Sequence, residues 1–572
     1  MIHPLGKRAN PKPDREALAS RFFWSKAMDQ NTEFREEFRF GSAGWATRAD
    51  IEKAGLFKRR GPQIGFLDGQ PLHLESDAPM ITIGGAGSGK CRDVLAYVLC
   101  QLHVERLFVL DLRGELGAIS IHNFAARGIN AYFWNPMSLA GLPHDNCNPL
   151  DVLTLCSGRL VADAQMVAAS LVPFSGGGEG KYFEQRARDW LANLMVHLVE
   201  EQGHVDFAML SRLINSIEGD TESWLNESEK TLESKFPSVR RTVGEMLAKQ
   251  ADAPKEFGAI MGTLYAGLSF LDDPALLASL ENPRFSLAAL CAEGRPSSFF
   301  LNVPHEYVGI LSPLLRCFFT SAMLYKSRKP DAPRITMLID EAGQMGNFPA
   351  LLHAFTFGRG AGIRAWAFFQ DLSQIKRNYG VDALQSFIGS AQFRQFFGVR
   401  DFETAELISK MLGMETLEYV DPLQRERAKH GKVQALLGTL MGNNPFQSAR
   451  DYKRFKAESE HRAKQTRRLM TPDEILAMPE SRTILFISGL NLRPIYAEKY
   501  PYFDRVEMAG RYLPNPYHPP VDRVRVMTAD GPDIRRVIVE PVPPEAANQF
   551  PQYREGHWSF VDGYRPLLGR SF

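Results

Sequence analysis

A glycine-rich segment near residue 90 has residue types and a spacing that could bind phosphate. Residues 84–91 read GGAGSGKC, which matches the pattern GxxxxGK, and they lie between an apolar run at 80–83 and a segment of helical pattern. In such a loop the glycines let backbone N–H groups curl around the β-phosphate, and the following helix adds the positive end of its dipole. Lys90 would reach the β- and γ-phosphates; a glycine-rich turn that contains lysine by chance is the simpler alternative. The residues expected to bind the nucleotide are Gly84, Gly85, Gly87, Ser88, Gly89, Lys90 and Cys91.

A second segment carries two adjacent carboxylates that could complete this site. Cys91 stands where a Ser or Thr hydroxyl normally ligates Mg²⁺, and a neutral thiol is a poor ligand for this hard cation. The apolar run 335–339 predicts a buried strand that ends in Asp340 and Glu341. We expect Asp340 to hold Mg²⁺ through water, and Glu341 to polarise an attacking water as the general base of ATP hydrolysis. A surface turn is the alternative for such a pair.

A third apolar run, 363–369, ends in Gln370. Its amide could contact the γ-phosphate or the attacking water, which would make it a third catalytic candidate beside Lys90 and Glu341. A glutamine that caps the next helix is the alternative.

The segments that carry these residues predict an α/β protein with a mostly parallel sheet. Apolar runs that end in a glycine or acidic turn and lead into helices are typical of strands joined by crossover helices. Residues 183–290 contain helical spacing and no convincing strand, which predicts an all-α insertion. The expected organisation is a polar arm at 1–40, a nucleotide-binding domain in two parts at 41–182 and 291–510, the insertion at 183–290, a basic stretch at 420–470, and an extended proline-rich tail at 511–572.

The overall charge excludes binding to nucleic acid by bulk charge alone, because 67 Lys and Arg face 66 Asp and Glu among 572 residues. Locally, residues 424–468 hold 12 Lys and Arg against 4 Asp and Glu. Such a segment could follow a phosphate backbone without reading its sequence, and a solvated basic face is the alternative. The candidates for contact with nucleic acid are Arg425, Arg427, Lys429, Lys432, Lys453, Arg454 and Lys456.

No stretch approaches 18 consecutive apolar residues, and the polar N-terminus lacks the apolar core of a signal peptide. These features predict a cytoplasmic protein.

Several segments together resemble the TraG-like coupling proteins of type IV secretion, which are hexameric motor ATPases of conjugation. The segment 109–116 is similar to the family's DPKGE-type motif, and 133–153 contains its two Asn-Pro motifs. The longest match is 338–380, LIDEAGQMGNFPALLHAFTFGRGAGIRAWAFFQDLSQIKRNYG. The remaining matches lie at 41–56, 396–413 and 467–479.

The resemblance implies a RecA-like motor domain interrupted by an all-α domain that recruits cargo. It implies ATP and Mg²⁺ as cofactors and a homo-hexamer in which an arginine from one subunit completes its neighbour's site. Arg359 matches the expected position, with Arg364 and Arg400 as rivals. It further implies single-stranded DNA with its relaxase, or protein effectors, as cargo, and the channel ATPases and inner-membrane subunits as partners.

Members usually begin with transmembrane helices, whereas only about 40 polar residues precede the matching region here. We therefore expect a cytoplasmic protein that is peripheral at the bacterial inner membrane, with a separate membrane-anchor protein as a partner. Members often carry Gly at the position of Cys91, so the missing hydroxyl does not mark an inactive enzyme. A double-stranded DNA pump of the FtsK/HerA kind and a docking adaptor with little hydrolysis are the alternative functions.

Overall fold

The computed structural model describes residues 41–101, 106–174, 180–419, 422–440, 445–460, 463–528, 530–554 and 557–562. The arm predicted at 1–40 lies outside the described residues. Contacts divide the chain into two compact units, a smaller one of 1–44 and 406–472 and a larger one of 45–405 and 473–572.

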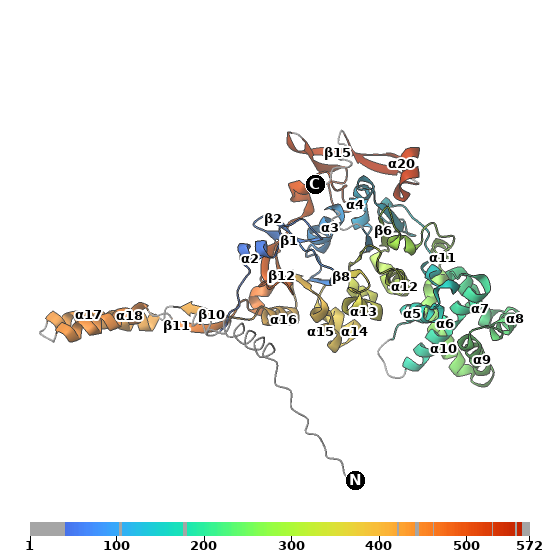
Figure 1. Ribbon diagram of the computed structural model, residues 1–572, viewed down its shortest axis with the longest axis horizontal. Coiled ribbons are helices and arrows are strands. Elements are labelled where there is room, and N and C mark those ends of the chain that lie inside the picture. Colours follow the sequence, from blue (N-terminus) through green and yellow to red (C-terminus); the bar gives the residue numbers. More distant parts are fainter. Residues whose placement is uncertain are drawn as a thin grey trace, which may run out of the picture. The chain divides into compact units, whose positions relative to one another are not determined.

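The larger unit is built on an eleven-stranded sheet in the order β2-β1-β13-β12-β9-β3-β8-β7-β4-β6-β5 (Figure 1). Its strands are β1 (Gln63–Leu67), β2 (Gln70–His73), β3 (Met80–Gly84), β4 (Leu107–Asp111), β5 (Asn130–Trp134), β6 (Ser297–Asn302), β7 (Ile335–Ile339), β8 (Ile363–Phe369), β9 (Phe393–Phe397), β12 (Arg482–Ile487) and β13 (Ile495–Glu498). From β9 to β5 every neighbouring pair is parallel, and the strands on the other side of β9 pair antiparallel.

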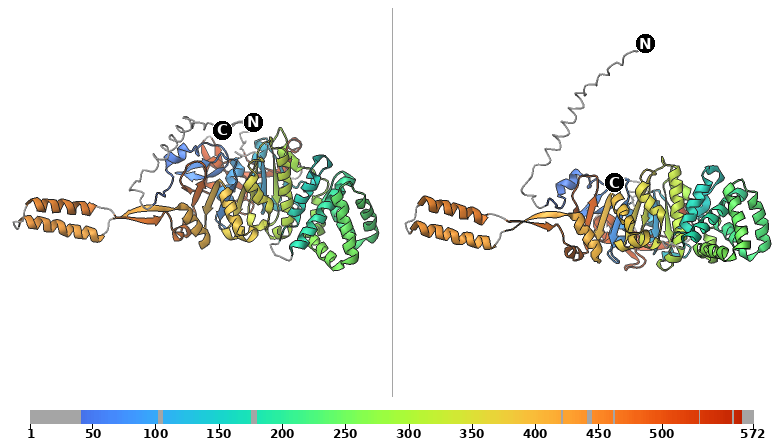
Figure 2. Two further views of the ribbon diagram at one scale, coloured as in Figure 1. Left: turned by 60° about the horizontal axis from the view of Figure 1, so that its bottom comes forward. Right: turned by 90° about the horizontal axis from the view of Figure 1, so that it is seen from below.

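Helices cover both faces of this sheet, as its apolar runs require (Figure 2). Neighbouring residues of a strand point to opposite faces. In β4, Phe108 contacts Phe319 of α12 (Val308–Arg328) with ring centroids 4.5 Å apart. The next residue, Val109, lies in a hydrophobic cluster with Leu116 and Phe124 of α4 (Glu115–Ala126). The α/β fold with a mostly parallel sheet is therefore confirmed.

One helical segment among the described residues, His305–Arg328, is long and apolar enough to cross a membrane, with a mean hydropathy of 1.4. Of that apolar window, 78% is buried inside the protein. Its apolar side chains therefore pack in the core.

Helices fill the chain between β5 and β6. Residues 180–290 form helices and short 3₁₀ turns and contain no strand. The helices of this region are α5 (Leu160–Leu171), α6 (Lys181–Gln202), α7 (Phe207–Gly219), α8 (Thr221–Leu232), α9 (Pro237–Asp252), α10 (Pro254–Leu268) and α11 (Pro274–Ser279).

The smaller unit contains a helical hairpin carried on a two-stranded ribbon, where the sequence indicated a weakly patterned stretch. Strands β10 (Met414–Tyr419) and β11 (Ala463–Arg468) pair antiparallel, and α17 (Pro422–Leu440) packs against α18 (Pro445–Glu460). A Cβ atom added to Gly431 would lie 2.6 Å from the Phe455 ring. The glycine therefore allows the two helices to approach closely.

The C-terminal residues differ from the extended tail that the prolines predict. They form a three-stranded antiparallel sheet of β14 (Arg523–Thr528), β15 (Gly531–Pro541) and β16 (His557–Val561). Alternating residues of β14, Val524 and Val526, are 3% and 0% exposed and join a hydrophobic cluster with Tyr97 and Ile119. The alternation in RVRVMT is the strand signal, and many prolines precede or follow the strands, where no ladder hydrogen bond is needed.

Candidate nucleotide site

The glycine-rich segment forms a tight loop at the carboxyl end of β3. Gly87 and Gly89 have positive φ angles of 70° and 91°, a left-handed conformation that glycine adopts without strain. Ser88 Oγ donates to the Gly85 carbonyl at 2.7 Å, and Lys90 Nζ donates to the Gly84 carbonyl at 2.9 Å. A Cβ at Gly85 would lie 2.4 Å from the Gly398 carbonyl oxygen, so the loop can lie this close only with glycine there.

The structure brings three predicted catalytic side chains together. Because β3, β8 and β7 are adjacent and parallel, the residues that follow them meet at one edge of the sheet. Lys90 Nζ lies 3.3 Å from Glu341 Oε1, and Gln370 Nε2 donates to Glu341 Oε2 at 2.8 Å. Asp371, not Gln370, caps the helix α14 (Leu372–Tyr379), since its carboxylate accepts from the Gln374 amide. The side-chain amide of Gln370 is therefore available to donate to Glu341.

Asp340 and Cys91 form the adjoining polar contact. Cys91 Sγ donates to Asp340 Oδ2 at 3.4 Å. Burial and the neighbouring Glu341 raise the pKa of Asp340 to about 7, and burial together with Asp340 raises the pKa of Cys91 well above its usual value. Cys91 is therefore a thiol, and not a thiolate, at neutral pH. Asp340 Oδ1 is buried without a hydrogen-bond partner among the described residues, which is the environment that a bound cation or its water would complete.

The segment 111–115 adds a second acidic turn beside the loop. Asp111, at the end of β4, accepts from the Gly117 amide at 2.8 Å and from Asn302 Nδ2 at 3.2 Å. Burial raises its pKa to about 6. Gly114, with φ 69°, turns the chain into α4.

A buried ion pair beneath the loop was missed by the sequence reasoning. Lys499 Nζ donates to the Ser88 carbonyl and to Asp93 Oδ2, each at 2.7 Å, and both charged side chains are 2% exposed. Burial lowers the pKa of Lys499. Its ammonium also lies 4.4 Å from the centre of the Phe397 ring. No local pattern joins residues 406 positions apart, so the sequence held no signal for this pair.

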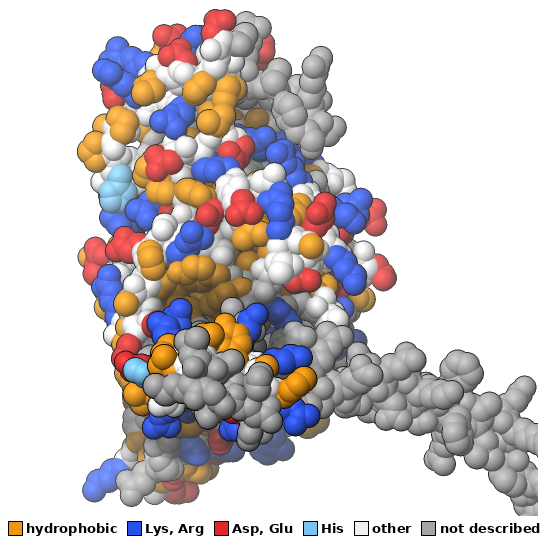
Figure 3. Space-filling view, turned by 90° about the vertical axis from the view of Figure 1, so that its left-hand side faces the viewer, with side chains coloured by type: hydrophobic (Ala, Val, Ile, Leu, Met, Phe, Trp, Pro, Cys, Tyr) orange, Lys and Arg blue, Asp and Glu red, His pale blue; other side chains and the backbone are white. Residues whose placement is uncertain are grey.

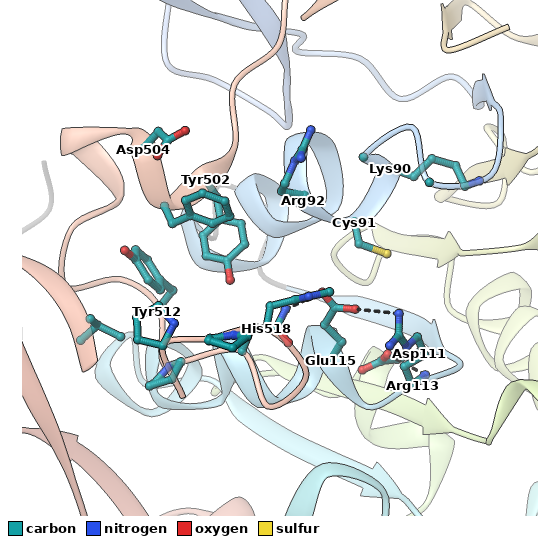
Figure 4. A pocket seen from close by; sticks show the side chains of 18 of the residues that line it. Lys90, Cys91, Arg92, Asp111, Arg113, Glu115, Tyr502, Asp504, Tyr512 and His518 are labelled. Atoms are coloured by element: carbon teal, nitrogen blue, oxygen red, sulfur yellow. Dashed lines mark hydrogen bonds and ion pairs between the residues drawn. The ribbon is translucent and has the colours of Figure 1, made fainter. Parts of the chain in front are cut away.

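The glycine-rich loop, the acidic turn and the end of β7 line a cavity of about 810 Å³ (Figure 4). One end of the cavity is lined by Lys90, Cys91, Asp340 and Glu341, and another end by residues of the C-terminal region that include Tyr502, Tyr512, His518 and Ile534.

The three arginine candidates occupy different environments. Arg364 is 7% exposed, and its Nε donates to Thr336 Oγ1 inside the sheet. Arg359 is exposed and lies 3.6 Å from Asp77, and Arg400 is also exposed. Neither Arg359 nor Arg364 lines the cavity of its own chain.

The predicted basic residues all lie on the helical hairpin. Their side chains are exposed except for that of Lys432, which is half-buried. Figure 3, which looks toward the hairpin's end, shows basic and hydrophobic side chains together there. Of the predicted residues, the exposed ones on α17 are Arg425, Arg427 and Lys429, and those on α18 are Lys453, Arg454 and Lys456.

The parallel sheet, the phosphate-binding loop and the acidic strand end together define a P-loop motor fold of the RecA-like class. Residues 39–519 match the family Type IV secretory system Conjugative DNA transfer. The chain belongs to this family, which confirms the resemblance seen in the sequence.

Relatives of the chain include the proteins named TraG and VirD4. It is 23% identical over 547 residues to the Conjugal transfer protein TraG of Escherichia coli, covering 86% of this chain and 81% of the relative. It is 24% identical over 400 residues to Protein VirD4 of Rhizobium radiobacter, covering 67% and 56%.

Solved structures of the plasmid coupling protein TrwB share the fold. The complex of TrwB with ADP and Mg²⁺ has a TM-score of 0.55 at 17% identity, covering 80% of this chain and 94% of TrwB. The complex with the ATP analogue ADPNP has the same TM-score and identity, and covers 81% and 97%.

Proposed function

We propose that this protein is an ATP-hydrolysing motor and receptor that couples single-stranded DNA with its relaxase, or protein effectors, to a type IV secretion channel. The observation that carries the proposal is the contact of Lys90 and Gln370 with one carboxylate, Glu341, beside the loop. TrwB, which shares the fold, has been solved with ADP and Mg²⁺ and with an ATP analogue.

The chain's own residues suggest a sequence of contacts. Backbone N–H groups of residues 84–91 bind the phosphates. Lys90 leaves Glu341 for the β- and γ-phosphates, and Glu341 is then free to accept a proton from the attacking water. Gln370 orients Glu341 and that water. Because two side chains hold Glu341 beforehand, the base is already in place when the nucleotide arrives.

Asp340 would hold Mg²⁺, directly or through water, because its Oδ1 has no hydrogen-bond partner among the described residues. Mg²⁺ would neutralise charge on the phosphate oxygens. The Cys91 thiol is a poor ligand, so its role is to donate to Asp340 when no cation is bound.

Completion of the site would need a second copy of the chain. We propose a homo-hexamer in which the exposed Arg359, or its rival Arg400, reaches the neighbour's γ-phosphate. We favour these two over Arg364, because Arg364 is 7% exposed and its Nε donates to Thr336 Oγ1 inside the sheet. At the bacterial inner membrane, the partners would be the channel ATPases and inner-membrane subunits, with a separate membrane-anchor protein.

The test of hydrolysis compares the wild type with Glu341→Gln, with and without single-stranded DNA. We expect the substitution to lower kcat about 10²- to 10⁴-fold, because it removes the general base. Glu293→Gln is the control, since Glu293 precedes β6 at the opposite edge of the sheet. Equal rates for the wild type and Glu341→Gln would overturn the motor. Stronger stimulation by duplex DNA would favour the double-stranded pump, and a wild type without hydrolysis would favour the adaptor.

The exposed basic side chains of the hairpin are proposed to contact the DNA backbone. Replacing Arg425, Lys429 and Lys453 by Gln should weaken binding of single-stranded DNA. A plot of the logarithm of the affinity against the logarithm of the salt concentration should also become less steep. Its slope should change by about 0.7 for each phosphate that is no longer neutralised. Lys255→Gln, an exposed substitution on α10, is the control. An unchanged salt slope in the triple variant would contradict this role.

A further inference from the structure

One end of the cavity is formed by a part of the chain that extends past the family match. Residues matching the family end at 519, whereas Arg523, Val524, Arg525 and Ile534 also line the cavity. They lie on β14 and β15 of the C-terminal sheet. Beside them are the rings of Tyr502, Tyr512 and His518, which lie on the opposite side of the view from Lys90 in Figure 4.

This wall is part of the packed core of the larger unit. The Tyr502 and Tyr512 rings meet edge to face with centroids 4.9 Å apart, and the two side chains are 4% and 6% exposed. Val526 of β14 and Ile119 of α4 belong to the same hydrophobic cluster. The Leu513 amide also donates to the Ile119 carbonyl at 2.9 Å. The aromatic wall is therefore held against the sheet's helices before any ligand binds.

Hydrogen bonds also tie the wall to the acidic turn beside the loop. Asn515 Nδ2 donates to Glu115 Oε1 at 2.5 Å, and the Tyr517 hydroxyl donates to the Arg113 carbonyl at 2.6 Å. The Arg113 guanidinium lies 4.8 Å from the centre of the Tyr517 ring. Contacts within one chain thus hold the aromatic wall against the acidic turn, which lines the same cavity as the phosphate loop.

The two ends of the cavity differ in chemistry. One end offers backbone N–H groups and the Lys90 ammonium, which bind anions. The other offers aromatic rings and the aliphatic Ile534, which pack against a planar heterocycle. A volume of about 810 Å³ has room for a ligand of nucleotide size.

We infer that the C-terminal sheet and the segment before it form the base subsite, which takes the purine of a nucleoside triphosphate whose phosphates lie on the glycine-rich loop. The inference rests on the proposed function, because the phosphates must first bind at Lys90. His518 and Ile534 supply the accessible surface, since both are exposed, and Tyr502 and Tyr512 form the fixed wall behind them.

The test compares binding of MgATP, MgCTP and magnesium tripolyphosphate to the full chain by calorimetry. We expect the wild type to prefer ATP over both other ligands, because a purine stacks over a larger area. Stacking of one base is worth about 1–3 kcal/mol, so His518→Ala and Ile534→Ala together should weaken ATP binding about 5- to 140-fold. Binding of tripolyphosphate should not change.

Val539→Ala is the matched control, because Val539 lies on the same strand, is 62% exposed and lines a different cavity. Its ATP affinity should equal that of the wild type. Equal affinity of the wild type for ATP and tripolyphosphate, or for ATP and CTP, would overturn the purine subsite, as would an unchanged ATP affinity in the double variant. Failure of the proposed function gives different results: tripolyphosphate does not bind to the wild type if the phosphate site is wrong, and the wild type hydrolyses ATP no faster than Glu341→Gln if the motor is wrong.

Discussion

The buried pair of Lys499 and Asp93 is expected to hold the phosphate-binding loop in its conformation. Lys499 Nζ donates to the Ser88 carbonyl and to Asp93 Oδ2. The side chains of Lys499 and Asp93 are each 2% exposed. Lys499→Met keeps the length of the side chain and removes both hydrogen bonds. Asp93 then remains buried, with Arg92 as its remaining charged partner at 2.6 Å.

The expected loss of stability follows from these interactions. Breaking a buried ion pair by removing one partner costs about 3–5 kcal/mol, because the other charge stays buried. Arg92 compensates part of this, and Met avoids the cost of burying an ammonium, so we expect the free energy of unfolding to fall by about 2–3 kcal/mol. The double variant Lys499→Met with Asp93→Asn leaves no buried charge. It should therefore be more stable than the sum of the single effects, by about 1–3 kcal/mol.

The assay is urea unfolding of the single and double variants, followed by binding of tripolyphosphate to each. Arg482→Gln serves as the control, because Arg482 lies 3.3 Å from Glu498 but is 35% exposed, and its loss should cost less than about 1 kcal/mol. The tripolyphosphate affinity should fall with Lys499→Met and stay constant with Arg482→Gln. If Lys499→Met unfolds at the same urea concentration as the wild type, or if the two single effects simply add, the pair does not support the loop.

Three further predictions concern the loop, its cation and the half-buried His122. Gly398→Ala should weaken tripolyphosphate binding at least about tenfold while the circular dichroism spectrum stays unchanged. The reason is that φ at Gly398 is 56° and the added Cβ would lie 2.4 Å from Ser88 Cβ. Unaltered binding would contradict this. Cys91→Ser should lower the Mg²⁺ concentration needed for half-maximal ATPase activity, since a hydroxyl is the better ligand, and an equal requirement would show that position 91 does not touch the cation. Burial lowers the pKa of His122 to about 4, so its neutral form stabilises the fold fully above pH 6.5 and this stability is lost as the pH falls toward 4. Relative to His122→Gln, the wild type should therefore lose about 2 kcal/mol of unfolding free energy between pH 7.5 and 4.5 in urea titrations, and parallel pH profiles would refute the shift.

The parts of the site that the sequence predicts are those in which a local pattern sets the position. A strand, a glycine-rich loop and a helix follow one another around Lys90, and an apolar strand ends directly at Glu341. Since parallel strands end at one edge of the sheet, the proximity of these residues follows from the order of patterns alone. The roles of these residues remain proposals that the enzymatic tests decide.

The parts that sequence reasoning missed depend on contacts between distant segments. Lys499 meets Asp93 because β13 joins the sheet beside β12, and nothing near either residue indicates that pairing. In the basic stretch, the many charged residues obscure the apolar pattern of the two helices. Their packing depends on Gly431 opposite Phe455. In the C-terminal region, the prolines outweighed the alternation of β14, although they lie mostly outside its ladder.

The place of β3 in the sheet has a consequence for synthesis of the protein. Its neighbours are β8 and β9, which begin at residues 363 and 393, so the strand that carries the glycine-rich loop has no pairing partner until well over half of the chain has been made. Lys499, beneath the loop, arrives later still. In a nascent chain on the ribosome, this apolar strand therefore stays unpaired for most of translation. ATP can begin to stabilise the fold only near the end of elongation.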